Sequence, residues 1–247
     1  SGCPIETLPD SFTQLTALTQ LKMNSCGLHA LPDNIGNLTS LQYVELYANA
    51  LTTFPKSMNQ LTGLKGLNVG RNPIHKIPDG LSTLTIDQRE WERLHESICQ
   101  NKTMTSLCVR GMGSIGMPKE IGNLTNLKEL YLRSCHLSEL PEEFGLLTQL
   151  EILYIPNNHL TSLPESFQNL TSLKHLDMEH NQFTEFPEVL LSLTQLEVLD
   201  ICENAITEIS DTIQSLQSLT SLNLYGLPIT EENKEQVRRL LPNCKVH

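Results

Sequence analysis

Positive charge and long apolar runs are both scarce in this chain. Its 247 residues include 17 lysines and arginines against 28 aspartates and glutamates, giving a formal net charge of -11 and a pI near 5.1. This balance argues against a general nucleic-acid binder, which needs a basic surface to replace phosphate counterions, and it disfavours docking on anionic membranes. No apolar run approaches the roughly 18–20 residues of a membrane span. The composition therefore predicts neither nucleic acid nor membrane as a partner.

Motifs of catalysis and cofactor binding are also missing. The chain has no glycine-rich phosphate loop, no G-x-S-x-G turn, no H-E-x-x-H helix and no paired C-x-x-C. No signal peptide is visible at the start. We therefore expect a protein that is not an enzyme and that holds no cofactor and no metal.

A repeat of 23 residues dominates the sequence instead. Eight blocks share one leucine frame, and they open at Thr16, Thr39, Thr62, Lys102, Thr125, Thr148, Thr171 and Thr194; a ninth, shorter copy opens at Gln217. The block from Thr171 reads TSLKHLDMEHNQFTEFPEVLLSL, which is the pattern L-x-x-L-x-L-x-x-N-x-L. Such a fixed period predicts a solenoid, in which each unit buries its apolar side chains only against its neighbours.

The two halves of a block predict different local structures. The stretch L-x-x-L-x-L alternates apolar and polar residues, which indicates a short strand with its leucines pointing inward. A segment such as LPDNIGNL at 31–38 follows, and its proline and short length favour a single helical or 3-10 turn. Stacked strands would then form a parallel sheet, and the wider outer side would curve the stack.

By this frame the chain resembles the leucine-rich repeat family over almost its whole length. The resemblance implies an α/β solenoid, a horseshoe with a parallel β-sheet on the concave face and short 3-10 or helical turns on the convex side. The 23-residue blocks with LPxxIGNLxxL are similar to intracellular Ras-group proteins of this family and to bacterial effectors delivered into host cells. Both relatives use their repeats to recognise proteins.

The frame also predicts one solenoid domain over residues 1–247. Its expected parts are a partial repeat (1–15), three repeats (16–84), a helical insertion (85–101), five repeats (102–216) and a last strand with a helical cap (217–247). In the cap, Thr230 is expected to begin a helix and Pro242 to end it, with an apolar stripe of Val237, Leu240 and Leu241. No comparable cover is visible at the start, where the chain opens in mid-repeat.

The insertion at 85–101 is the one irregular segment. Either Thr85 with Gln88 or Asp87 with Glu90 fits a capping box, and the apolar residues on one helical face are Trp91, Leu94 and Ile98. We expect an amphipathic helix of about three turns on the outside of the horseshoe. Two interpretations of Trp91 are open: it packs against an imperfect part of the core, or it forms part of a second docking site.

Asparagine or cysteine occupies the inward turn position of the frame. Asparagine stands at Asn49, Asn72, Asn158, Asn181 and Asn204, and cysteine at Cys3, Cys26 and Cys135. Cys108 and Cys202 are expected on the open face about 19 Å apart, too far for a disulfide. The terminal cysteine clusters of many extracellular relatives are missing, so we predict a reducing compartment.

Outward strand positions do not serve the core and are therefore free for binding. The predicted partner-binding residues are Tyr47, Arg71, Arg110, Tyr131, Arg133, Tyr154, Asp177, Glu179, His180, Asp200 and Glu203. The middle of this set is rich in arginine and tyrosine, which dominate binding hot spots, and its C-terminal part is acidic. We expect an elongated partner whose acidic part contacts the arginines and whose basic part contacts the carboxylates. Alternatively, these positions are ordinary solvated ones and binding lies elsewhere.

Two narrower interpretations concern the same surface. Potential metal ligands lie on adjacent strands at His175, Asp177, Glu179, Asp200 and Cys202, but a flat sheet rarely brings four ligands together, so no metal is expected. The arginines are instead suited to a phosphate or a phosphorylated segment.

The sequence thus predicts a non-catalytic protein-interaction module that binds a partner protein through its concave face. The alternative is the substrate-recognition domain of a larger enzyme or a host-targeted effector, for example a ubiquitin ligase. We expect a monomer in the cytoplasm or, alternatively, a secreted bacterial effector acting in the host cytosol.

Overall fold

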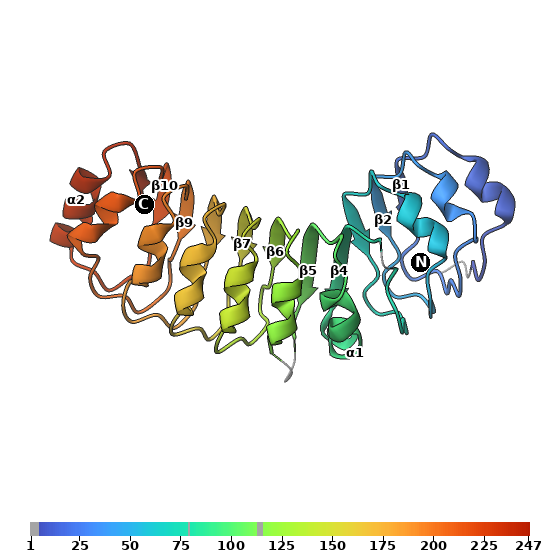
Figure 1. The fold of residues 1–247 in the computed structure, drawn as a ribbon, viewed down its shortest axis with the longest axis horizontal. Helices are drawn as coiled ribbons and strands as arrows, with labels where there is room; N and C mark the ends of the chain where they lie inside the picture. Colours follow the sequence, from blue (N-terminus) through green and yellow to red (C-terminus); the bar gives the residue numbers. More distant parts are fainter. Residues whose placement is uncertain (1–4, 79, 113–115) are drawn as a thin grey trace. The chain divides into compact units, whose positions relative to one another are not determined.

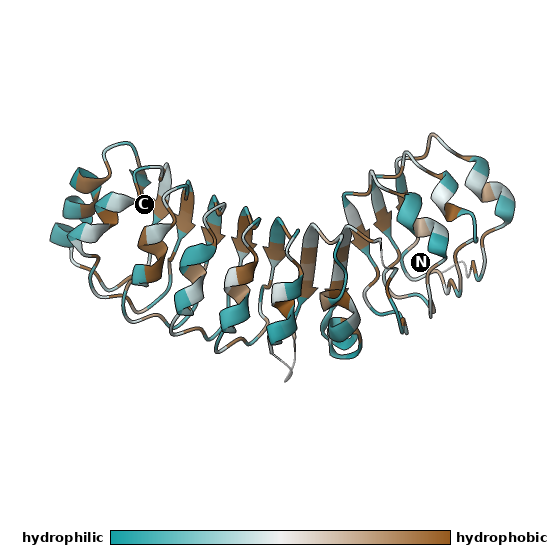
Figure 2. Ribbon diagram, viewed as in Figure 1, coloured by the Kyte–Doolittle hydropathy of each residue, from teal (hydrophilic) through white to brown (hydrophobic). Residues whose placement is uncertain are grey.

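The computed structural model describes residues 5–78, 80–112 and 116–247 (Figure 1). The chain divides into two compact units, residues 1–112 and residues 113–247, and each has its own core. Within each unit, parallel strands line one side and short helices lie on the other. Figure 2 shows apolar residues concentrated on the strands and hydrophilic residues on the outer surfaces of the helices.

In its described residues, the first unit has five strands and one α-helix. Its 3-10 turns are η1 (Asp10–Gln14), η2 (Ile35–Asn37) and η3 (Lys56–Gln60). Its strands are β1 (Gln20–Lys22), β2 (Tyr43–Glu45), β3 (Gly66–Asn68), β4 (Thr83–Asp87) and β5 (Ser106–Arg110), and α1 spans Gln88–Cys99. Each strand pairs in parallel with the next along the chain.

The second unit repeats the same alternation and ends in a helix and a short strand. Its strands are β6 (Glu129–Tyr131), β7 (Ile152–Tyr154), β8 (His175–Asp177), β9 (Val198–Asp200), β10 (Ser221–Asn223) and β11 (Lys245–Val246). Its 3-10 turns are η4 (Lys119–Asn123), η5 (Glu142–Leu146), η6 (Glu165–Asn169), η7 (Glu188–Ser192) and η8 (Asp211–Ser215), and α2 spans Glu231–Leu240. All of its strand pairings are parallel.

The leucine–proline signature produces the 3-10 turns as expected. Pro141 lies at the N-cap of η5 in an extended conformation, and its carbonyl oxygen accepts the N–H of Phe144 at 2.9 Å. Proline is well placed there because its missing N–H has no partner at a helix start. Phe144 and Phe167 are fully buried and stack with ring centroids 6.0 Å apart, so successive turns share one core.

An asparagine ladder closes the turn after most strands. Asn158 is typical: its Oδ1 accepts the N–H groups of Cys135 and Leu137, and its Nδ2 donates to the carbonyl oxygens of Leu132 and Ile155. Asn49, Asn72, Asn181 and Asn204 are also buried, and each donates to carbonyl oxygens of its own and of the preceding repeat. These bonds confirm the predicted role of the position, because buried backbone groups need partners. Cys26 and Cys135 donate from Sγ to the carbonyl oxygens of Asn24 and Arg133, whereas Cys3 lies outside the described residues.

The prediction of an insertion at 85–101 is wrong. Residues 83–87 form β4, a full member of the sheet, whose Thr85 pairs with Asn68 of β3 and with Cys108 of β5. Partner residues are 23 positions apart in the described pairs of neighbouring repeats from β1 to β10, except that Asn68 and Thr85 are 17 apart. The block that opens at Thr62 is therefore the short one, and in the described chain no 3-10 turn separates β3 from β4.

The predicted amphipathic helix is present as α1, in the place that a 3-10 turn takes in other repeats. Asp87 is its N-cap and forms a capping box with Glu90, which decides between the two alternatives. Trp91, Leu94 and Ile98 are completely or almost completely buried, and α1 packs on β4 and β5. These three residues extend the apolar frame of Leu81 and Leu84, so residues 80–101 belong to a repeat with an α-helix rather than to an insertion.

The C-terminal cap is confirmed, with one addition. Thr230 begins α2 and accepts the N–H of Asn233 at 3.2 Å, while Val237 and Leu241 are buried and Leu240 only partly so. After Pro242 the chain adds β11, which the sequence analysis missed. Ser221 and Leu222 of β10 pair with Lys245 and Val246, because a free strand edge offers unpaired backbone groups.

Candidate functional site

Two tyrosines form the aromatic centre of the strand side in the second unit. Tyr131 and Tyr154 are register partners on β6 and β7, and their rings stack with centroids 5.2 Å apart at 16°. Tyr131 is half-buried and Tyr154 is exposed, as is Arg133 two residues after Tyr131. The parallel register brings equivalent outward side chains of neighbouring strands together. All three residues are among those predicted from the sequence.

Carboxylates follow the tyrosines across the same side. Asp177 of β8 is the register partner of Tyr154 on one side and of Asp200 on the other. Burial is the main cause that raises the pKa of Asp177 to about 6, and the nearby Glu179 and Asp200 charges add to it, while the Glu179 N–H and Arg133 act in the opposite direction. No lysine or arginine forms an ion pair with either aspartate among the residues that the structure describes.

Asp177 and Asp200 also form hydrogen bonds within the fold. Asp177 Oδ1 accepts the N–H of Glu179, and Asp200 Oδ1 accepts the N–H of Cys202, both at 3.0 Å. Asp200 Oδ2 additionally accepts Asn223 Nδ2 at 2.8 Å. The two bonds to backbone N–H groups close the ends of β8 and β9 in the manner of Asx turns. One oxygen of Asp177 and both oxygens of Asp200 are thus engaged by the fold, and these bonds leave the second oxygen of Asp177 for a partner.

The potential metal ligands gather only in part. Ligand atoms of Glu179, Asp200 and Cys202 lie within 4.8 Å of one another. Cys202, expected on the open face, is buried at 6% exposure, and its Sγ donates to Glu179 at 3.7 Å. Burial, together with the two carboxylates, raises the pKa of the Cys202 thiol well above its ordinary range. The thiol is therefore protonated at neutral pH, and metal binding requires a thiolate.

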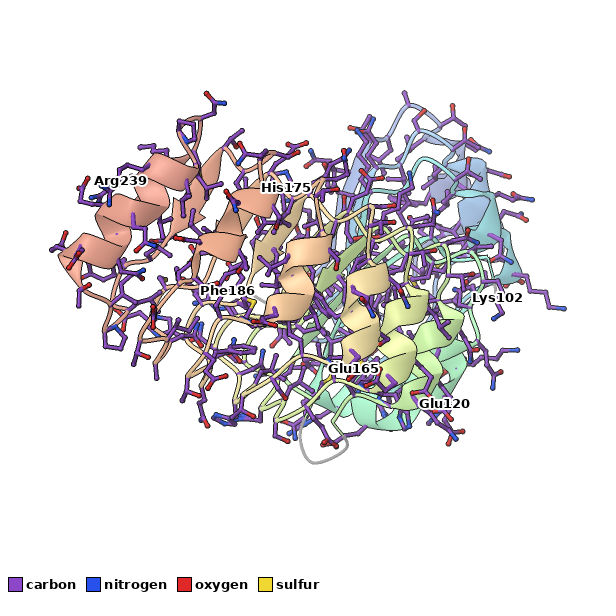
Figure 3. All side chains as sticks on the ribbon, turned by 60° about the vertical axis from the view of Figure 1, so that its left-hand side comes forward. Lys102, Glu120, Glu165, His175, Phe186 and Arg239 are labelled. Carbon is purple, nitrogen blue, oxygen red and sulfur yellow. The ribbon has the colours of Figure 1, made fainter. Side chains whose placement is uncertain are left out.

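Three further predicted residues share an unusual backbone conformation. Arg71, His180 and Glu203 adopt φ of 55°, 50° and 52°, in the turn that follows each strand. Their side chains are exposed. Figure 3 shows the contrast between His175, on the strand β8, and Glu120 and Glu165, which project from the 3-10 turns.

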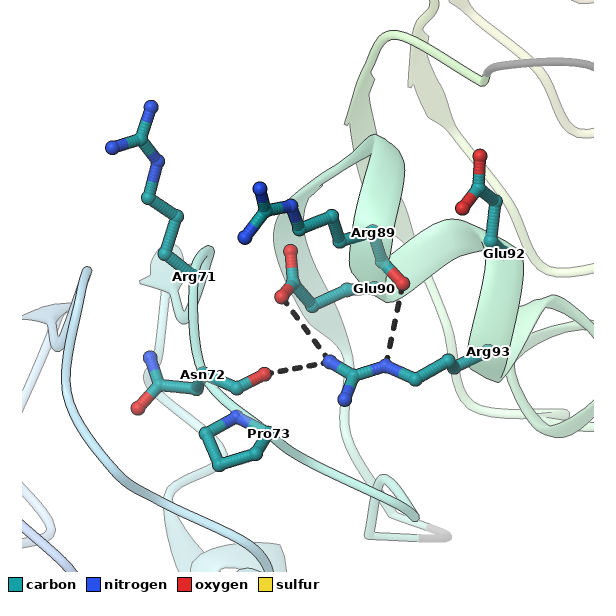
Figure 4. Close-up of a pocket in the computed structure, with 7 residues that line it drawn as sticks. All are labelled: Arg71, Asn72, Pro73, Arg89, Glu90, Glu92 and Arg93. Atoms are coloured by element: carbon teal, nitrogen blue, oxygen red, sulfur yellow. Dashed lines mark hydrogen bonds and ion pairs between the residues drawn. The ribbon is translucent and has the colours of Figure 1, made fainter.

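In the first unit, the predicted residues Arg71 and Arg110 line hollows beside the start of α1. The guanidinium of Arg71 lies 5.4 Å from the centroid of the Tyr47 ring, a cation–π distance. One hollow of about 460 Å³ is lined by Arg71, Asn72, Pro73, Arg89, Glu90, Glu92 and Arg93 (Figure 4). A second, of about 460 Å³, is lined by Arg71, Asp87, Gln88, Arg89, Glu92 and Arg110.

Glu90 is the buried acid of this region. Its side chain is almost completely enclosed, and its Oε1 lies 3.4 Å from Nη2 of Arg93. Burial, followed by the neighbouring Asp87, raises the pKa of Glu90 to about 7, although the backbone N–H of Arg71 donates to it. Glu90 therefore titrates near neutrality. The sequence analysis used Glu90 only as a cap, because no pattern signals its burial.

Trp91 is fully enclosed and has no surface with which to contact a partner. Of its two interpretations, core packing agrees with the structure and docking through this side chain does not. The residues that sequence reasoning missed are Asp87, Arg89 and Glu92, which precede and follow Trp91 at the rim of the hollows. The signal that could have found these three residues is the apolar spacing of Leu81, Leu84 and Ile86, which matches the strand part of the repeat.

The net negative charge belongs entirely to the second unit. Residues 1–112 contain nine lysines and arginines and nine aspartates and glutamates, whereas residues 113–247 contain eight and 19. The unit with the tyrosine pair is thus strongly acidic, and the unit with the arginine-lined hollows is neutral. Among the described residues, no helix is both long and apolar enough to cross a membrane.

A family described as a leucine-rich repeat region matches residues 118–244, more than half of the chain. The chain belongs to the leucine-rich repeat family. The expected fold class, a solenoid of parallel strands and short 3-10 turns, is therefore confirmed. No curated protein matches its sequence significantly.

Solved leucine-rich repeat structures are similar to this one. The Leptospira interrogans protein LIC12759 is 25% identical, with a TM-score of 0.50, over 98% of this chain and 75% of that one. The ectodomain of the Arabidopsis thaliana receptor kinase GASSHO1/SCHENGEN3, in complex with CASPARIAN STRIP INTEGRITY FACTOR 2, is 26% identical, with a TM-score of 0.60, over 100% of this chain and 31% of that one. An internalin (inlF) of Listeria monocytogenes, 18% identical with a TM-score of 0.59 over 97% and 82%, shows the shared fold alone.

Proposed function

We propose that this protein is a non-catalytic protein-binding module, and that the strand side of residues 113–247 binds a basic segment of a partner protein. The observation that carries the proposal is the stacked pair of Tyr131 and Tyr154 beside the carboxylates of Asp177 and Asp200. Tyrosine supplies a large contact area at low conformational cost, and the acids supply complementary charge. This strand side is the one that the sequence analysis expected to be concave.

Charge supports a basic partner. The second unit has a large excess of acidic residues, and the half-buried Asp177 is the register partner of Asp200. In the described part of the chain neither aspartate forms an ion pair, and the nearby charge of Asp200 helps to raise the pKa of Asp177. A lysine or arginine of the partner would relieve this repulsion and could also lie over an exposed tyrosine face. The first unit is neutral and would not attract the same segment.

The related structures give independent support for binding as the role. The plant receptor ectodomain is in complex with a second molecule, CASPARIAN STRIP INTEGRITY FACTOR 2, and another similar structure is the Drosophila Toll–Spatzle complex. The chain spans only 31% and 35% of those two, so whether it works alone or as the recognition part of a larger enzyme or effector is a separate proposal. We favour the simple binding module.

The experiment is an affinity capture that compares three purified proteins of verified fold. Tyr131→Ala/Tyr154→Ala removes the aromatic pair, and Leu146→Ala removes an exposed apolar residue from η5 on the opposite side. We expect a partner held by the wild type and by Leu146→Ala, eluted by moderate salt, and bound at least about tenfold less by the double variant. A partner retained equally by all three proteins would contradict the assignment of the surface.

The compartment is a second testable part of the proposal. We propose a cytoplasmic protein, supported by Cys26 and Cys135, whose reduced thiols take the inward turn position that asparagine takes elsewhere. Alkylation of protein purified without reductant should modify seven thiols after unfolding. A smaller number, restored by reduction, would contradict this compartment.

A further inference from the structure

Three arginines converge at the start of α1 without an acidic partner. The two hollows there share Arg71 and Arg89, and the second is also lined by Arg110. Among the residues that the structure describes, none of the three guanidinium groups is ion-paired with a carboxylate. In Figure 4 the dashed lines all run to the guanidinium of Arg93, and none joins the guanidinium of Arg71 or Arg89 to another of the residues drawn.

The neighbouring carboxylates are all otherwise engaged. Asp87 Oδ1 accepts the N–H of Arg89 as the helix cap. Glu90 is buried against Arg93, and Glu92 Oε1 accepts Gln88 Nε2 at 2.9 Å. These acids bond within α1 and to Arg93, so none of them forms an ion pair with Arg71, Arg89 or Arg110 among the residues that the structure describes.

The arginines also come from regular, well-held elements. Arg71 lies in the turn after β3 with its guanidinium over the Tyr47 ring, and Arg89 lies in the first turn of α1. Arg110 ends β5, where it is the register partner of Asp87, and its guanidinium lies beside the Cys108 thiol. Donors held by rigid elements lose little freedom on binding.

We propose that these hollows bind a phosphate monoester, presented by a phosphorylated side chain on a partner protein. A carboxylate is satisfied by one guanidinium fork, whereas a phosphate dianion has three oxygens and accepts from several forks at once. The first unit carries no net charge, so the anion is not repelled there as it would be in the second unit. The assignment of the phosphate to a side chain of a partner protein rests on the proposed function, but the binding of phosphate by these arginines does not.

The test titrates the whole chain with three small probes. They are N-acetyl-O-phosphoserine methylamide, N-acetylglutamate methylamide and inorganic phosphate, and binding is followed by the NMR signals of the arginine Nε–H groups. Variants Arg71→Gln and Arg89→Gln remove hollow arginines, and Arg239→Gln removes an exposed arginine of α2 as the matched control. The fluorescence of buried Trp91 checks that each variant keeps its fold.

We expect saturable shifts at Arg71, Arg89 and Arg110 with the phosphoserine probe, about tenfold tighter than with the glutamate probe. Each hollow variant should weaken binding by about tenfold, because a charge-assisted hydrogen bond is lost, and Arg239→Gln should not. Equal binding of the phosphoserine and glutamate probes, or no saturable shift, would overturn the proposal. Tighter binding of inorganic phosphate than of the phosphoserine probe would overturn the protein source.

The result is separable from that of the capture experiment. Tyr131→Ala/Tyr154→Ala leaves the first unit intact, so it should bind the phosphoserine probe as the wild type does. Equal capture by all three proteins together with saturable phosphoserine binding would contradict the proposed function alone. Loss of capture by the double variant together with no saturable phosphoserine binding by the wild type would contradict the phosphate site alone.

Discussion

Arg93 donates a hydrogen bond from Nη2 to the carbonyl oxygen of Asn72, 2.7 Å away. The same guanidinium lies against the buried Glu90, which in turn accepts the backbone N–H of Arg71. The repeat of α1 has Arg89 where the frame expects asparagine, so the ladder cannot continue through it. The Glu90–Arg93 pair takes over the contact with the preceding turn. A contact between a carboxyl group and a guanidinium thus stands where a neutral amide serves elsewhere.

The burial of Glu90 predicts that the free energy of unfolding depends on pH near neutrality. Burial raises the pKa of Glu90 from 4.5 to about 7, so between these values the folded state binds more protons than the unfolded state. The contribution of Glu90 is therefore full below about pH 4.5 and is lost as the pH rises through 7, by at most about 1.4 kcal/mol per pH unit. Glu90→Gln should lack this loss. Urea unfolding at pH 5 and pH 8 measures it.

A nearby carboxylate provides the control for this experiment. Glu96→Gln removes an exposed acid from the same helix and should keep the pH dependence of the wild type. If Glu90→Gln and the wild type lose the same stability between pH 5 and pH 8, Glu90 does not titrate as described.

The asparagine ladder predicts a large cost at Asn158. Asn158→Ala leaves the N–H groups of Cys135 and Leu137 without their acceptor inside the core. Each buried unsatisfied group costs about 1–3 kcal/mol, so we expect a loss of about 3 kcal/mol in the free energy of unfolding. Ser162→Ala, at an exposed position of the same repeat, should stay within about 0.5 kcal/mol. A cost below about 1 kcal/mol at Asn158 would show that water replaces the amide.

Close approach of successive turns predicts opposite effects at two glycines. A Cβ at Gly145 in η5 would overlap the backbone oxygen of Ser166 in η6, whereas at Gly63 the nearest atom is 3.7 Å away. Gly145→Ala should cost about 1–3 kcal/mol through overpacking. Gly63→Ala should be neutral or stabilising by up to about 1 kcal/mol, because it restricts the unfolded chain. Thermal unfolding compares them, and equal effects would contradict the tight contact.

Asp177 predicts pH-dependent binding of a basic partner. Its pKa is about 6, mainly through burial, so it is ionised at pH 7 and largely protonated at pH 5. Partner affinity should fall as the pH drops through 6, by at most about tenfold per pH unit for one proton. Asp177→Asn should bind the partner more weakly at pH 7, and its affinity should no longer fall as the pH drops through 6. The exposed Glu185→Gln should keep it, and an unchanged pH profile in Asp177→Asn would exclude Asp177 from the interface.

The sequence anticipated much of the candidate surface because parallel register follows from the period. Tyr131, Tyr154 and Asp177 are 23 residues apart, and the structure makes them direct neighbours. It could not show that Asp177 and Asp200 also accept backbone N–H groups, or that Cys202 is buried against Glu179. Those outcomes depend on side-chain direction at the strand end, which the apolar pattern does not encode.

By itself the sequence determined the solenoid, the inward leucines, the asparagine ladder and both helices, because each follows from local spacing and capping chemistry. Only the tertiary structure decided that residues 83–87 pair as β4, which turned an expected insertion into a repeat and placed Arg89 beside Arg71. The burial of Glu90, and the rise in its pKa that follows from it, are also visible only in the tertiary structure. The physical reason is that neighbouring repeats decide which strands pair and which side chains lose contact with water. The spacing of 17 residues between Asn68 and Thr85 changes which residues of the two repeats become neighbours.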